Sequence, residues 1–315
     1  MVYKIIILIE NDKIEKSTKT KRGKKGENVE VRQKDTTEAI AFYKRVPEML
    51  ERHVIPVADC DLVVYHRPGS SSKGHIIFYH GACGRSQMWA HQYDAFDGFD
   101  LYFVNVRGQG ESPMKVGLPD LEGAVQDVDD ILKHFQLDKV ILVGHSWGGN
   151  SLQVYTYRHP ERVRALVMVD SWGQHRYLSD KEKSRIKYSS LMYKTIPWKI
   201  IADKNSKMCT DNPITRELVK TAIIETGRDV FLNLGITGFL AVHEIEGYLG
   251  NPPMLLVRGE NDFPKHLNKI YEGIIALNPN AYQVTISGSK HQPMNDHPEE
   301  FNRLVGEFFE EVFAQ

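Results

Sequence analysis

The stretch VILVGHSWGG, residues 140–149, decides the fold of this chain. Its first four residues form a continuous apolar run, which is typical of a strand buried on both faces. Gly144 and Gly148, two residues before and two after Ser146, let the backbone turn sharply into residues 151–158, which have helical character. Ser146 therefore lies in a strand-to-helix turn, which presents its hydroxyl at the carboxyl edge of the predicted sheet.

Apolar runs of the same kind alternate with helical patterns along the chain. Continuous runs occupy residues 76–79, 101–104, 165–169, 254–257 and 282–286, and shorter strands are expected at 54–57 and 62–65. Apolar side chains recur every three or four residues across 121–135 and 301–312. This alternation predicts an α/β fold with a mostly parallel central sheet and helices on both faces.

Residues 172–250 interrupt the alternation. They contain no strong strand signal, several helix-like segments and scattered aromatic residues such as Trp198 and Phe231. The interval is too long for a plain loop, because loops above roughly 15 residues are uncommon in compact domains. We therefore predict a helical cap inserted into a core of residues 53–171 and 251–315. Its aromatic residues either line an acyl pocket or form the cap's own core.

Residues 1–52 precede the core and are predicted to form an N-terminal extension. The apolar run at 5–9 is too short to span a membrane and lacks a small-residue cleavage site after it, so a strand is expected rather than a signal. A polar, mostly basic loop leads to a second strand near 28–32, and a helix follows. The edge-like first strand suggests that the extension pairs with another copy of the chain in a homo-oligomer.

Charge and cysteine content exclude several classes of protein. Lys and Arg number 40 against 41 Asp and Glu, which leaves no electrostatic case for binding nucleic acid or a membrane. The basic loop at 11–26 has no interleaved aromatic residues, so a nucleic-acid arm is the weaker interpretation. The cysteines, Cys60, Cys83 and Cys209, have no paired metal-ligand spacing. We expect a reducing, cytoplasmic setting without a disulfide framework, a metal or a cofactor.

Ser146 needs partners, because a serine hydroxyl is a poor nucleophile at neutral pH without a base and an acid that orients the base. Asp262 comes just beyond the strand at 254–257, at the carboxyl end where open α/β sheets place their sites. His291 lies in the loop between the last strand and the last helix. We predict Ser146 as the nucleophile, His291 as the base and Asp262 as the orienting acid.

Other residues compete for two of these roles. Asp170 also follows a core strand and could replace Asp262 as the acid. His243 in the predicted cap and His297 at the start of the last helix compete with His291. Roles in such a site are fixed by geometry, although the order nucleophile, acid, base along the chain favours His291.

The segment HGACG at 80–84 follows another buried strand. A turn at this place can aim a backbone N–H at the substrate oxygen that becomes negative during the reaction. We predict that the N–H groups of Ala82 and Trp147 form an oxyanion hole. His80, His145 and Cys83 are expected to be structural.

Five motifs in a fixed order resemble the α/β-hydrolase family, in particular its cap-bearing, cofactor-free branch. They are HGACG at 80–84, NVRGQGES at 105–112, GHSWGG at 144–149, GEND at 259–262 and GSKH at 288–291. The resemblance extends over residues 53–315 and implies the same triad, the same two backbone donors and no cofactor. Asn105 departs from the family, in which many members have Asp, and this bears on a turn rather than on the triad.

The expected function is hydrolysis of an ester or related acyl bond in a small, partly apolar molecule through an acyl-enzyme on Ser146. A serine nucleophile disfavours epoxide hydrolase and haloalkane dehalogenase chemistry, for which similar proteins use Asp. Lactonase, C–C bond hydrolase, aminopeptidase and perhydrolase activities use the same equipment, and the sequence does not choose among them. The alternative from another class is a ligand receptor or interaction protein that turns over slowly or not at all.

Overall fold

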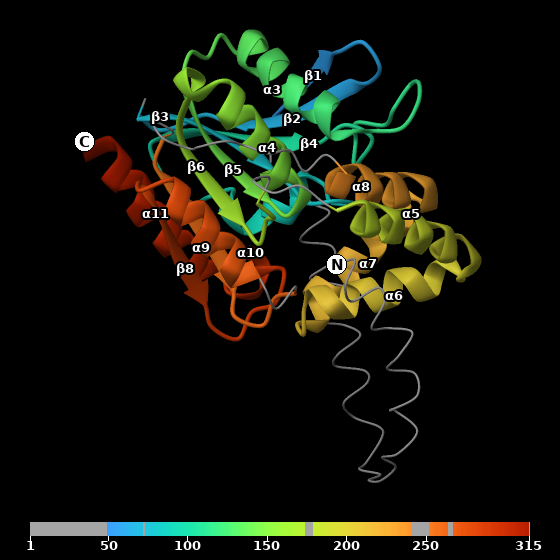
Figure 1. The fold of residues 1–315 in the computed structure, drawn as a ribbon. Coiled ribbons are helices and arrows are strands. Elements are labelled where there is room, and N and C mark those ends of the chain that lie inside the picture. Colours follow the sequence, from blue (N-terminus) through green and yellow to red (C-terminus); the bar gives the residue numbers. More distant parts are fainter. Residues whose placement is uncertain (1–48, 72, 174–178, 241–251, 264–266, 315) are drawn as a thin grey trace, which may run out of the picture.

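A computed structural model describes residues 49–71, 73–173, 179–240, 252–263 and 267–314 of the chain (Figure 1). The hairpin, basic loop and helix expected in the N-terminal extension lie outside these residues. The homo-oligomer contact assigned to the extension lies outside them as well.

An eight-stranded, mostly parallel sheet forms the centre of the molecule, with the strand order β1-β2-β4-β3-β5-β6-β7-β8. The pairs β1–β2 and β2–β4 are antiparallel, and the pairs from β4 to β8 are parallel. The predicted α/β-hydrolase fold class is confirmed. The strands are β1 (Glu51–Pro56), β2 (Asp61–Arg67), β3 (Gly74–Tyr79), β4 (Phe99–Asn105), β5 (Val140–His145), β6 (Val163–Val169), β7 (Met254–Gly259) and β8 (Ala281–Ile286).

The edge strand β1 begins at Glu51, inside the predicted extension. Glu51 and Arg52 pair with His66 and Tyr65 of β2, and this ladder ties them to the core sheet. The boundary at residue 53 therefore falls inside a strand. An edge strand needs no continuous apolar run, which is why its first residues give no strand signal in the sequence.

Helices cover both faces of the sheet. Phe78 and Tyr79 are neighbours on β3, so their side chains point to opposite faces. The ring of Phe78 packs on Trp89 of the 3-10 helix η2 (Ser86–Gln92), and Trp89 contacts Phe301 of α11 (Pro298–Ala314). The hydroxyl of Tyr79 instead donates to the carbonyl of Ala124 in α3 (Leu121–His134).

The remaining helices of the core are α4 (Trp147–Arg158), α9 (Leu267–Leu277), α10 (Pro293–Asp296) and the short 3-10 helix η3 (Pro160–Arg162). Helix α4 packs on α3 and on strands β5 and β6. In the part of the chain that the structure describes, no helix is both long enough and apolar enough to cross a bilayer.

The described part of the interval between β6 and β7, for which the sequence predicts a helical cap, contains four helices: α5 (Asp180–Thr195), α6 (Trp198–Cys209), α7 (Pro213–Thr226) and α8 (Arg228–Leu240). They form a group of their own beside the sheet (Figure 1). Helix α8 contacts α3 and α4. A Cβ added at Gly238 of α8 would lie 2.5 Å from Cδ1 of Trp147, so α8 packs directly on the residue after Ser146.

Candidate active site

Ser146 occupies a strained turn between β5 and α4. Its φ is 51° and its ψ is -118°, a backbone conformation that residues other than glycine rarely adopt. The N–H of Ser146 donates to the carbonyl of Val169 at 2.8 Å, which holds the turn against β6. Gly144 lies against Gly149 so closely that a Cβ would overlap the backbone of α4. The glycines of GHSWGG thus let α4 fold back tightly on β5.

Ser146, His291 and Asp262 meet at the carboxyl end of the sheet. Oγ of Ser146 lies 2.9 Å from Nε2 of His291, and Nδ1 of His291 lies 2.9 Å from Oδ1 of Asp262. The same Oδ1 accepts the N–H of Phe263 at 2.7 Å. The structure therefore brings together three side chains that the sequence places in three separate loops.

The surroundings of His291 fix its orientation and its charge. Its backbone N–H donates to the carbonyl of Cys209 at 2.9 Å, and its ring lies 5.0 Å from that of Phe263, centroid to centroid. Burial lowers the pKa of His291, so the imidazole is neutral near pH 7. With its Nδ1–H donated to Asp262, the Nε2 lone pair faces the hydroxyl of Ser146, as general-base catalysis requires.

Asp170, the alternative acid, lies in the same site, with a carboxyl oxygen within 4.8 Å of ligand atoms of both Asp262 and His291. Its Oδ1 accepts the N–H of Gly259 at 2.9 Å. Burial raises the pKa of both carboxyl groups, and the charge of Asp262 raises that of Asp170 further. Oδ2 of Asp170 and Oδ2 of Asp262 are both buried without a hydrogen-bond partner among the described residues, and one proton between them would satisfy both. Of the two carboxyl groups, that of Asp262 hydrogen-bonds to the imidazole of His291.

Of the two histidines that compete with His291, only His297 lies among the described residues. His243 lies outside the described residues. His297 lies at the junction of α10 and α11, where its backbone N–H donates to the carbonyl of Pro293 at 3.0 Å.

Ala82 and Trp147 flank the serine from two elements. Ala82 lies in the turn that follows β3, and Trp147 is the first residue of α4. The first amides of a helix have no acceptor within the helix, and the N–H of Trp147 is one of them. The turn is closed by the N–H of Gly84, which donates to the carbonyl of Gly81 at 3.0 Å.

His80 and His145 brace the turns of the site as neutral side chains. Nε2 of His80 accepts the N–H of Val106 at 3.0 Å, and its Nδ1 donates to the carbonyl of Gly81 at 2.8 Å. Burial lowers the pKa of His80 to about 4. Nε2 of His145 donates to the carbonyl of His291 at 2.8 Å, and burial lowers the pKa of His145 as well.

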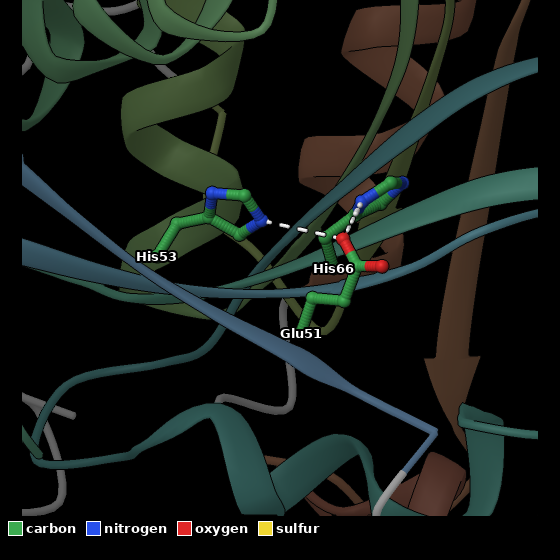
Figure 2. Close-up of side chains that lie close together, drawn as sticks. All are labelled: Glu51, His53 and His66. Atoms are coloured by element: carbon green, nitrogen blue, oxygen red, sulfur yellow. Dashed lines mark ion pairs between the residues drawn. The ribbon is translucent and has the colours of Figure 1, made fainter.

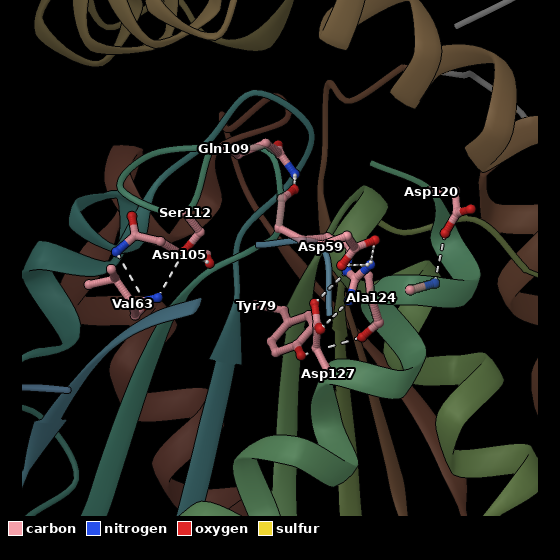
Figure 3. Close-up of polar contacts among 11 residues, drawn as sticks. Asp59, Val63, Tyr79, Asn105, Gln109, Ser112, Asp120, Ala124 and Asp127 are labelled. Carbon is pink, nitrogen blue, oxygen red and sulfur yellow. Dashed lines mark hydrogen bonds and ion pairs between the residues drawn. The ribbon is translucent and has the colours of Figure 1, made fainter. Parts of the chain in front are cut away.

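A residue that the sequence analysis did not single out supports the turn after β3. Oε1 of Gln109, in the segment NVRGQGES, accepts the N–H of Cys83 at 2.6 Å. The loop that carries Gln109 is anchored by Arg107, which forms ion pairs with Asp127 and Asp59 (Figure 3). The place of Gln109 inside this motif is the one sequence signal that could have pointed to it.

The hydrogen bonds of the Asn105 side chain account for an amide at a position where many members of the family have a carboxylate. Nδ2 of this side chain donates to the carbonyl of Val63 at 3.4 Å (Figure 3). Its Oδ1 accepts the N–H of Ser86 at 3.2 Å. A carboxylate at this position could accept but not donate. The amide therefore suits these neighbours, and the substitution stays within the turn.

A cavity of about 70 Å³ opens beside Ser146 and extends under the inserted helices. The inserted helices contribute Asn205, Cys209, Val219, Ala222, Ile223 and Phe231 to its wall. Phe231 also packs on Trp198 with ring centroids 5.3 Å apart, so this aromatic residue both lines the cavity and belongs to the core of the insertion. Burial raises the pKa of Cys83 to about 12, which keeps this thiol of the wall protonated and unreactive.

Known proteins that resemble this chain share its fold. The family model described as alpha/beta hydrolase fold matches residues 74–198. The chain is 26% identical over 274 residues to 1-acylglycerol-3-phosphate O-acyltransferase ABHD5 of Rattus norvegicus. This alignment covers 75% of this chain and 77% of that protein.

Two solved structures align over most of the chain. A thermophilic esterase from Thermogutta terrifontis aligns with a TM-score of 0.71 at 18% identity, over 84% of this chain and 99% of the esterase. A mutant epoxide hydrolase of Vigna radiata aligns with a TM-score of 0.68 at 18% identity, over 84% of this chain and 100% of that one. At these identities the structural likeness shows the fold alone.

Proposed function

Because this chain has the α/β-hydrolase fold, we propose that it is a serine hydrolase that cleaves an ester or related acyl bond. One observation carries the proposal: the hydroxyl of Ser146 hydrogen-bonds to the neutral imidazole of His291, which is held in turn by Asp262. A serine hydroxyl becomes a good nucleophile in this set of contacts.

In the proposed reaction, Oγ of Ser146 attacks the carbonyl carbon of the substrate while Nε2 of His291 takes the hydroxyl proton. The carbonyl oxygen becomes negative and accepts hydrogen bonds from the N–H groups of Ala82 and Trp147. The tetrahedral intermediate collapses, and His291 returns the proton to the departing alcohol. Water, deprotonated by His291, then attacks the acyl-enzyme and releases the acid and Ser146. None of these steps draws on a cofactor.

The cavity indicates the class of substrate. Its wall beside Ser146 includes Val219, Ala222, Ile223 and Phe231, which favour an apolar acyl group. A volume of about 70 Å³ admits a short acyl chain without movement of the inserted helices. We therefore assign a small, partly apolar ester to the site and a cap function to residues 172–250.

A fluorophosphonate probe tests the nucleophile. The intact protein should be labelled at Ser146, and both Ser146→Ala and His291→Ala should abolish labelling. Ser151, which is buried in α4 and hydrogen-bonded to the carbonyl of Trp147, provides the matched control: Ser151→Ala should be labelled normally. An intact, folded protein that the probe does not label would instead favour a ligand receptor or interaction protein.

A panel of p-nitrophenyl esters of increasing acyl length, with lactones and aminoacyl amides, tests the reaction. Short esters should be hydrolysed fastest, and Ser146→Ala should lower kcat by about 10⁴ or more. Equal rates in the wild type and Ser146→Ala would refute the acyl-enzyme mechanism.

A second candidate reaction differs in the acceptor of the acyl group. The relative from Rattus norvegicus is named as an acyltransferase of 1-acylglycerol-3-phosphate, and it covers 75% of this chain. The same acyl-enzyme on Ser146 could pass its acyl group to an alcohol in place of water. Adding 1-acylglycerol-3-phosphate to the ester assay distinguishes the two, since transfer yields a diacyl product and hydrolysis yields free acid.

The cellular setting is part of the proposal. Cys60, Cys83 and Cys209 are all free thiols, and Cys60 and Cys83 are buried. This suits a reducing compartment such as the cytoplasm.

A further inference from the structure

The strands β1 and β2 place three metal-binding side chains on one face of the sheet. Glu51 and His53 are two residues apart on β1, so their side chains point the same way. His66 of β2 is the cross-strand partner of Glu51 and joins them on that face. Figure 2 shows the carboxylate of Glu51 between the two imidazole rings.

We propose that Glu51, His53 and His66 bind a divalent transition-metal ion, with Zn²⁺ as the best fit. Oε2 of Glu51 lies 3.6 Å from Nε2 of His53 and 3.4 Å from Nδ1 of His66, and all three atoms lie within 4.8 Å of one another (Figure 2). Tetrahedral Zn²⁺ with bonds of about 2.0 to 2.1 Å holds its ligand atoms about 3.3 to 3.4 Å apart. The observed spacing therefore requires small side-chain adjustments and no backbone movement.

The neighbours of His66 orient its ring so that Nδ1 faces Glu51. Nε2 of His66 lies 3.0 Å from Oδ1 of Asp100, and its ring stacks on Tyr102 with centroids 4.6 Å apart. A carboxylate behind a metal-binding histidine fixes the tautomer that leaves the other nitrogen unprotonated. In this tautomer the Nδ1 lone pair of His66 faces the carboxylate of Glu51, so both groups could bind one cation between them.

His53 also has a side chain behind its ring, which is the imidazole of His134. Its Nδ1 lies 3.5 Å from Nε2 of His134 on α3. Its Nε2 is buried and makes no hydrogen bond within the described part of the chain, although it points toward Glu51. A metal ion would give this atom the partner that it lacks. Two imidazole nitrogens and one carboxylate oxygen suit zinc, with water as the fourth ligand.

The site lies at the opposite end of the parallel strands from Ser146. His66 pairs with Tyr102 of β4, and Asp100 pairs with His75 at the start of β3, whereas the active-site turns follow the strands' carboxyl ends. The ion would link the edge strand β1 to β2. The ion would take no part in the proposed hydrolase reaction, whose side chains lie at the other end of the strands.

Zinc titration of the chelator-treated full-length protein tests the site, with affinity measured against a chromophoric chelator. The wild type should bind Zn²⁺, and X-ray absorption should report nitrogen and oxygen ligands at about 2.0 to 2.1 Å. Glu51→Gln and His66→Gln should each weaken binding on the order of 100-fold. Asp100→Asn should weaken it about 10- to 100-fold by releasing the ring of His66.

Two controls separate this site from others that bind zinc. His159 forms a His–Glu pair with Glu161 on the surface, so His159→Gln is the matched variant and should bind normally. Among the described residues a second cluster of this kind is formed by Asp170, Asp262 and His291, and His291→Ala, which removes its histidine, should keep the site.

Thermal unfolding gives a second readout. Zn²⁺ at about 100 times Kd should raise the Tm of the wild type by about 5 °C and leave the Tm of Glu51→Gln unchanged. Glu51 has a 59% exposed side chain, so this variant should fold normally. Unchanged zinc affinity in both Glu51→Gln and His66→Gln would overturn the site and would identify the contacts as ordinary ion pairs. Absence of zinc binding to the wild type would overturn it equally.

Discussion

Exchanging each of the two buried carboxyl groups for an amide should affect catalysis very differently. Asp262→Asn keeps the shape of the side chain but removes the negative charge, which lies 2.9 Å from Nδ1 of His291. The imidazolium formed during the reaction then lacks its counter-charge, and the neutral ring can adopt the wrong tautomer. A loss on the order of 10⁴ in kcat is expected for such a change, which corresponds to about 5 kcal/mol of transition-state stabilisation.

Asp170→Asn should lower kcat by less than about tenfold. In the structure Oδ1 of Asp170 accepts the N–H of Gly259 at 2.9 Å. Burial raises the pKa of Asp170, so its other oxygen would carry a proton and donate it to Asp262. An asparagine reproduces both contacts, because its carbonyl accepts and its NH₂ donates. Asp170→Ala removes both contacts and leaves two buried polar groups unpaired, at a cost of about 1 to 3 kcal/mol of folding stability for each.

The assay is kcat and KM for a short p-nitrophenyl ester, with active sites counted by fluorophosphonate labelling and folding checked by circular dichroism. The reasoning is refuted if Asp170→Asn loses three orders of magnitude while Asp262→Asn remains active. That result would make Asp170 the acid that orients His291.

Three further predictions follow from burial and packing. Activity depends on neutral His291, whose pKa burial lowers, so kcat/KM should rise with pH through a midpoint below 6.5; a midpoint above 7 would contradict this. Asp127→Ala leaves the buried guanidinium of Arg107 without its closest counter-charge and should cost about 3 to 5 kcal/mol in urea unfolding, whereas a loss under 1 kcal/mol would mean that Arg107 is hydrated. Gly149→Ala places a methyl group against the hydroxyl of Ser171 and should lower the free energy of unfolding by about 1 to 3 kcal/mol. Its control, Gly235→Ala, has nothing within 4 Å and should be neutral or stabilising. Equal effects of the two variants would show that α4 has room to shift.

Short-range patterns predicted most of the fold. Strands such as β3 and β5 are apolar over consecutive residues because helices cover both faces, so neither face needs polar side chains. The turn at Ser146 is equally local, since the strand, the glycines and the helix that build it are contiguous. These features can be found without knowing any distant contact.

The edge of the sheet could not be predicted in the same way. β1 is an edge strand with exposed positions, and its pattern of exposed and buried residues does not mark where it begins. The cluster of Glu51, His53 and His66 depends on the antiparallel register of β1 and β2. That register is a property of two paired strands and is not visible in either strand alone.

The sequence alone was enough to predict the fold class and the strand-to-helix turn that carries Ser146. It also gave the order along the chain in which the candidate acid and base follow this serine. The hydrogen bond of His291 to Asp262 and not to Asp170 is visible only in the folded chain, because the two aspartates follow neighbouring parallel strands and both could reach the site. The tertiary structure also placed Gln109 under the turn after β3. The physical reason is range: a hydrogen bond acts over about 3 Å, and spacing along a chain does not specify distances that small between residues far apart in sequence.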